Sequence, residues 1–76
     1  MSLAFVLITT NIGEEAELVR ELEAFDLVKE VYTVFGVHDL IVRLEAESTD
    51  EIKELVTGKI KRMSNVRSTS TLFAID

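Results

Sequence analysis

Residues 36–39 are the part of this 76-residue chain where we most expect chemistry. They join two strand-like stretches, and they bring a backbone-permissive Gly36, the imidazole of His38 and the carboxylate of Asp39 to the point where the strands meet. The pattern predicts a place to hold a small molecule. Catalysis has little support, because no carboxylate forms an evident relay with His38 and no serine or cysteine lies in a nucleophile motif. We predict that the chain is not an enzyme and that His38 lies in a solvated turn.

Composition limits the alternatives. The chain has no cysteine and one histidine, so we expect no disulfide, no metal site and no cofactor. A net charge of −6 argues against direct nucleic-acid binding. The basic group of Lys59, Lys61, Arg62 and Arg67 is interpreted as a solvated helix end. No apolar stretch approaches the roughly 20 residues that span a bilayer, and no signal peptide is evident, so we expect a cytoplasmic protein without membrane contact.

Chain length makes a partner necessary. We treat residues 1–76 as a single domain, and a domain this small buries only about 60% of the surface that its unfolded chain exposes. Because disulfides and metals are excluded, oligomerisation is the remaining source of stability.

Hydrophobic patterning predicts four strands and two helices. The expected strands are residues 3–10, 28–35, 40–46 and 66–75, with residues 36–39 as the hairpin connection. Apolar residues at helical spacing predict a first helix after the turn at residues 11–15, with a stripe of Leu18, Val19, Leu22 and Phe25. The spacing of Ser48 and Glu51 is that of a capping box, so a second helix should begin there and end at residues 64–65.

Three details of the strands are also predicted. The second face of residues 40–46 contains Arg43 and Glu45, so this strand should lie nearer an edge. In the last strand, Val66 should share a face with Ser68, Ser70 and Leu72. We expect Phe35 to pack in the core.

The order of elements predicts a fold. It is β-α-β-β-α-β, the α+β, ferredoxin-like arrangement of a four-stranded antiparallel sheet with two helices on one face. Residues 3–8 are aliphatic or aromatic on both faces. We therefore expect the uncovered sheet face to dimerise with a second copy.

The residues resemble a known family over nearly the whole chain, the ligand-sensing domain of the Lrp/AsnC transcription regulators, or RAM domain. The most specific part is Val31 to Val42, with Gly36-x-x-Asp39 between an aromatic-containing strand and an aliphatic one, and residues 66–71 match the final Thr-x-Thr strand. Regulators of this family carry a helix-turn-helix before this domain, so the resemblance implies a stand-alone sensing form. It also implies dimers that associate into rings such as octamers, with amino-acid effectors between subunits, and it allows mixed oligomers with a full-length regulator.

An amino acid or related metabolite needs an anion near its ammonium group and hydrogen-bond donors near its carboxylate. We assign Asp39 to the ammonium group. The predicted contacts with the carboxylate are the amides of Gly36, Val37 and His38 and the hydroxyls of Thr69 and Thr71. Candidate pocket walls are Tyr32, Val34 and Ser70. If the turn binds no ligand, Gly36 is there because the backbone needs a positive φ angle, and Asp39 hydrogen-bonds within its own turn.

Three other functions fit the predicted fold. A dimeric α/β-barrel enzyme, such as a small monooxygenase or isomerase, uses the same unit, with His38 as its acid–base group. An ACT-type module would also bind amino acids between subunits, and Gly13 occupies the position of its usual glycine. A purely structural oligomerisation module would need no ligand.

Overall fold

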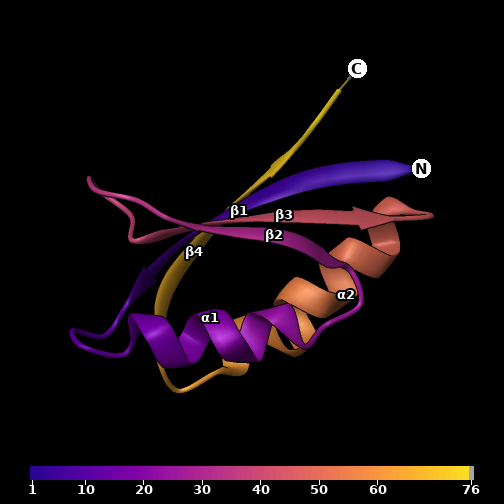
Figure 1. Ribbon diagram of the computed structural model, residues 1–76. Helices are drawn as coiled ribbons and strands as arrows, with labels where there is room; N and C mark the ends of the chain where they lie inside the picture. The colour runs from indigo at the N-terminus through magenta and orange to yellow at the C-terminus, as the bar shows by residue number, and fades with distance from the viewer. Residues whose placement is uncertain (76) are drawn as a thin grey trace.

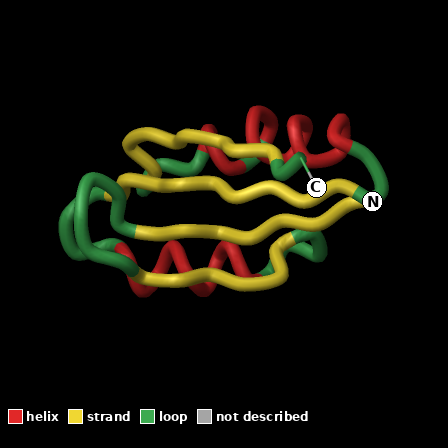
Figure 2. Tube along the Cα trace, turned by 90° about the horizontal axis from the view of Figure 1, so that it is seen from above, coloured by secondary structure: helices red, strands yellow, loops and turns green. Residues whose placement is uncertain are grey.

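A four-stranded antiparallel sheet forms the centre of the computed structural model, which describes residues 1–75 (Figure 1). The strands are β1 (Ser2–Thr10), β2 (Val28–Thr33), β3 (Leu40–Ala46) and β4 (Val66–Phe73), in the spatial order β2-β3-β1-β4. Helices α1 (Glu15–Glu23) and α2 (Thr49–Gly58) both lie on one face of the sheet (Figures 1 and 2). The predicted β-α-β-β-α-β fold is confirmed.

Strict alternation in the central strands separates the two faces of the sheet. Every second residue of β1 and β3 is buried beneath the helices, because successive side chains of a strand point to opposite faces. Leu18 and Leu22 of α1 and Ile52 of α2 close the core from the other side. The fully buried side chains are Ile8, Leu18, Leu22, Leu40, Leu44, Ile52, Ile60, Val6 and Val42. Each contributes about 1.5–3 kcal/mol relative to an exposed position.

The opposite face of the sheet has no covering element among residues 1–75 (Figure 1). We call it the open face. Along β1 it presents Leu3, Phe5 and Leu7, which are half-buried by their neighbours. On the two edge strands it presents Tyr32, 48% exposed, and Leu72, 53% exposed. An apolar surface of this kind marks an interaction site more often than an ordinary solvated face.

Several elements end earlier in the chain than the sequence predicted. β2 ends at Thr33 rather than at residue 35, and β4 ends at Phe73 rather than at residue 75. The α-helix of the second helical segment stops at Gly58, and a short 3-10 helix, η1 (Ile60–Arg62), follows it. Lys59 leaves helical geometry at φ −128°, and the tighter turn then returns Ile60 to the core.

Three predictions about individual strands were wrong. β3 is central rather than near an edge, because it pairs with both β1 and β2, and its Arg43 is satisfied inside the sheet by an ion pair with Glu30 of β2. Phe35 lies outside β2 and is fully exposed rather than in the core. A β-bulge at Thr9 and Thr10 pairs Val66 with buried Thr10, so Val66 lies on the helix-covered face and not with Ser68.

Candidate functional site

The connection between β2 and β3 is a six-residue loop, residues 34–39, which projects beyond the end of the sheet (Figure 1). Two backbone hydrogen bonds hold its base. The amide of Val34 donates to the carbonyl of Asp39 at 2.9 Å, and the amide of Asp39 donates to the carbonyl of Ile8 at 2.8 Å. The loop is therefore fixed both to itself and to the neighbouring strand β1.

Asp39 has a structural partner. Its Oδ2 accepts a hydrogen bond from the backbone amide of Thr10 at 2.9 Å, and Thr10 is only 3% exposed. A carboxylate bonded to a backbone amide makes one of the stronger hydrogen bonds in proteins, and it has about four lone-pair positions. Asp39 can anchor the loop and still accept a bond from a ligand.

His38 also faces the end of β1. Its Nδ1 lies 3.2 Å from Oγ1 of Thr9, and the same threonine hydroxyl lies 3.4 Å from the carbonyl oxygen of Val37. The tautomer of His38 decides whether the hydroxyl donates to the ring or to the carbonyl. The half-buried imidazole is thus more constrained than the solvated turn histidine that we predicted.

The tip of the loop is apolar and exposed. Gly36 has φ +131°, a conformation that side-chain-bearing residues rarely adopt, so a glycine is required there. On either side of it, Phe35 and Val37 are almost entirely exposed. Val34, a predicted pocket wall, is half-buried at the base of the loop.

The structure does not bring the two predicted threonines to this loop. Thr69 pairs with Ile8 and Thr71 with Val6, so both lie on the helix-covered face of β4. β1 lies between β4 and β3, which separates the backbone of Thr69 from that of Asp39 by two strand spacings, about 10 Å. Oγ1 of Thr69 is buried and has no hydrogen-bond partner among residues 1–75.

The other two predicted pocket walls, Tyr32 and Ser70, lie on the open face and are exposed. The hydroxyl of Tyr32 donates to Oε1 of Glu30 at 2.6 Å, and Nε of Arg43 donates to the same oxygen at 2.8 Å. Arg43 is also paired with Glu45. The Tyr32 hydroxyl and Arg43 lower the pKa of Glu30, whereas the bond to Glu30 raises the pKa of Tyr32. Sequence reasoning missed this network, because the pairing of β2 with β3 brings its members together.

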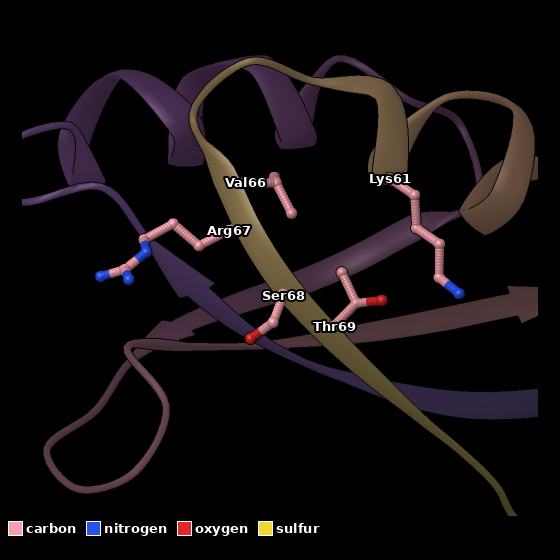
Figure 3. Close-up of a pocket in the computed structure, with 5 residues that line it drawn as sticks. All are labelled: Lys61, Val66, Arg67, Ser68 and Thr69. Carbon is pink, nitrogen blue, oxygen red and sulfur yellow. The ribbon is translucent and has the colours of Figure 1, made fainter.

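Two cavities lie elsewhere on the chain. The first, of about 290 Å³, is lined by Lys61, Val66, Arg67, Ser68 and Thr69, and we call it the β4 cavity (Figure 3). The second, of about 250 Å³, lies beside Met1, Leu27 and Glu51. Neither is lined by residues 36–39.

Two other kinds of site are absent from residues 1–75. In this range there is no group of three or more histidine, cysteine, aspartate or glutamate side chains that could hold a metal ion. No helix in the same range is long and apolar enough to cross a membrane.

Solved structures of similar sequence share the whole fold. FFRP-DM1 is 40% identical, with a TM-score of 0.95, over 99% of this chain and 100% of its own. A hypothetical protein from Pyrococcus horikoshii is also 40% identical, with a TM-score of 0.93, over 99% and 90% of the two chains. A protein from Thermus thermophilus is 32% identical, with a TM-score of 0.94, over 100% and 95%.

A curated relative is about twice as long as this chain. The HTH-type transcriptional regulator FL11 of Pyrococcus abyssi is 27% identical over 73 residues, which are 96% of this chain and 48% of that protein. The chain thus spans about half the length of this curated relative. AsnC of E. coli shares the fold, with a TM-score of 0.85 at 21% identity.

The family model of the Lrp/AsnC ligand binding domain matches residues 3–76. That family is a ligand-binding domain of transcription regulators and not a family of enzymes, in agreement with the prediction from the sequence. The chain belongs to the Lrp/AsnC ligand-binding domain family.

Proposed function

We propose that this domain senses an amino acid or a related small metabolite, which it binds at an interface between subunits. The observation that supports the proposal best is the loop at residues 34–39. It is firmly anchored to β1, and its residues line neither of the two cavities described above. Such a half-site would become a pocket only when another subunit covers it.

The chemistry of an amino acid matches the groups at this loop. Asp39 would accept the ammonium group through positions that Thr10 leaves free, and the amides of Gly36, Val37 and His38 would donate to the carboxylate. Because β1 separates Thr69 and Thr71 from Asp39, we assign these hydroxyls to the ligand only where a neighbouring subunit supplies them. A related fold, the regulator NMB0573 of Neisseria meningitidis, was solved as a complex with L-methionine.

A second copy of the chain is the proposed partner of the open face. Phe5 and Leu7 on β1 are apolar, and beside them the hydrogen-bonded network of Tyr32, Glu30 and Arg43 extends from the edge strand β2 to Arg43, which pairs with Phe5. Two such faces packed together would bury the apolar side chains of β1 next to polar groups that already have partners. We propose that dimers formed in this way assemble further into a ring such as an octamer. Mixed assembly with a full-length Lrp/AsnC regulator would then connect the domain to transcription.

A thermal-unfolding screen against the common amino acids tests the proposal, with oligomer mass measured by light scattering with and without each hit. A ligand at about one hundred times its Kd adds about 2.7 kcal/mol of stability, which shifts Tm by roughly 11–22 °C in a domain of this size. We expect one or a few amino acids to shift Tm and to change the mass.

The informative variant is Asp39→Asn, with Asp26→Asn as the matched control. An asparagine oxygen can still accept the Thr10 amide, but it removes the charge that an ammonium group needs. The ligand-induced shift should disappear in Asp39→Asn and persist in Asp26→Asn, since Asp26 is exposed and remote from the loop. An equal shift in both variants would refute the assignment of Asp39. No shift with any amino acid would refute the proposed ligand class.

A further inference from the structure

Charge is distributed unevenly along this acidic chain. All of its 14 acidic residues except Asp76 lie within residues 1–54. Residues 55–75 contain no aspartate or glutamate, but they contain Lys59, Lys61, Arg62 and Arg67, half of the 8 basic residues. This segment forms the end of α2, then η1 and β4, and the β4 cavity lies between η1 and β4.

The β4 cavity is rich in hydrogen-bond donors. Lys61 extends from η1 along one side of β4, and the side chain of Thr69 lies on that same side with its hydroxyl oxygen directed toward the lysine (Figure 3). Among residues 1–75, the ammonium group of Lys61 has no ion pair, and the Thr69 hydroxyl has no hydrogen-bond partner. Arg67 and Ser68 point to the other side of the strand (Figure 3).

The edge of β4 adds a backbone donor to the same place. The amide of Ala74 donates to the carbonyl of Leu3 at 2.9 Å. Counting back from Ala74, every second residue of β4 directs its amide toward β1. Thr69 lies an odd number of residues from Ala74. Its amide therefore points away from β1, toward the free edge of the sheet. The Lys61 ammonium group, the Thr69 amide and, once its side chain rotates, the buried Thr69 hydroxyl can therefore serve one cavity, and no carboxylate lines it.

We propose that the β4 cavity is a binding site for a phosphate group, either free phosphate or the phosphoryl end of a small metabolite. Lysine acts as a compact point charge toward phosphate, and a hydroxyl and an amide supply further donors to its oxygens. A volume of about 290 Å³ is near the lower limit of ligand pockets, which suits a small ligand. A buried hydroxyl without a partner is costly, so binding that reorients and satisfies Thr69 is favourable.

Within one chain this site is separate from the loop at residues 34–39, because none of the lining residues belongs to that loop, and only Thr69 is shared with the amino-acid contacts proposed above for a neighbouring subunit. Calorimetric titration of the full chain with inorganic phosphate, at constant ionic strength, tests the proposal. We expect saturable binding that weakens at least tenfold in Lys61→Met, a variant that keeps most of the aliphatic stem. The matched control is Lys53→Met, an exposed lysine of α2 in an acidic segment, which should bind within twofold of the original chain. Asp39→Asn should also bind phosphate with the affinity of the original chain, which distinguishes this site from the proposed amino-acid site.

A second set of variants locates the ligand at β4. Thr69→Val, which replaces the hydroxyl by a methyl group of similar size, should weaken phosphate binding several-fold, and Thr69→Ser should restore it. Thermal unfolding without phosphate shows that each variant is folded. Equal affinity in Lys61→Met and Lys53→Met, or loss of binding in both, would overturn the proposal, because binding would then follow net charge alone.

Two further ligands identify the source of the phosphate group. Tighter binding of glycerol 3-phosphate than of inorganic phosphate would indicate the phosphoryl end of a metabolite, and the reverse order would indicate the free ion. Acetate that binds more tightly than either would overturn the assignment, because the cavity would then select a carboxylate.

Discussion

Replacing Asp39 by alanine should destabilise the domain even when no ligand is present. The Asp39 carboxylate accepts the amide of Thr10 at 2.9 Å, and Thr10 is 3% exposed, so the variant leaves a buried amide without a partner. A hydrogen bond to a charged group contributes about 1.5–3 kcal/mol. A loss of about 2 kcal/mol lowers Tm by roughly 8–16 °C in a domain of this size.

The assay is thermal and urea unfolding of the original chain, Asp39→Ala and Asp39→Asn at one fixed protein concentration, since subunit association also contributes to stability. Asp39→Asn keeps a neutral acceptor for the Thr10 amide, so it should lose about 1 kcal/mol, less than the alanine variant. Equal midpoints for all three proteins would refute the reasoning, because the bond to Thr10 would then contribute nothing. A lower midpoint for Asp39→Asn than for Asp39→Ala would also contradict it.

Three further predictions concern Glu30 on the open face and two glycines. The Tyr32 hydroxyl and Arg43 lower the pKa of Glu30 below its ordinary 4.5. The ionised carboxylate therefore adds stability above that pH, and the contribution is lost as the pH falls through the lower pKa of the folded state. Urea midpoints between about pH 3 and 6 should fall less steeply in Glu30→Gln, and an unchanged slope would contradict the lowered pKa. Gly36→Ala should cost about 1–3 kcal/mol because φ is +131°. Gly58→Ala should instead stabilise α2 by up to about 1 kcal/mol, since an added Cβ meets nothing within 4 Å. Urea unfolding measures both glycine variants, and shifts of the same sign would contradict the difference in backbone conformation.

The sequence predicted the elements of the fold well, because periodicity is a local property. β3 was predicted with the bounds that the structure shows, since Leu40, Val42 and Leu44 alternate strictly with other residues. Strand ends were less predictable. Phe35 is a good strand former, but a strand ends where its hydrogen-bonded partner ends, and that depends on the neighbouring chain segment.

The site was harder to predict because its contacts are long-range. Asp39 and Thr10 are separated by 29 residues, and only the antiparallel pairing of β1 with β3 brings them together. Similarly, spacing placed Thr69 and Thr71 on one face of the last strand, but it could not show that this face is the one beneath the helices. The position of Arg43 within the sheet depends on its pairing with Glu30, which no local pattern reveals.

The position of β1 suggests how ligand binding and assembly would be coupled. β1 contributes Phe5 and Leu7 to the open face, and the next residue on that face, Thr9, contacts His38 and Val37 of the loop. A partner that packs on the open face would therefore contact the same strand that anchors the proposed ligand site. By reciprocity, a ligand that orders the loop would favour the arrangement of β1 in which a second copy packs best. Thr9→Val removes the hydroxyl contact with His38 and puts a methyl group of similar size in its place, so it should reduce the effect of ligand on oligomer mass while leaving ligand-free assembly intact.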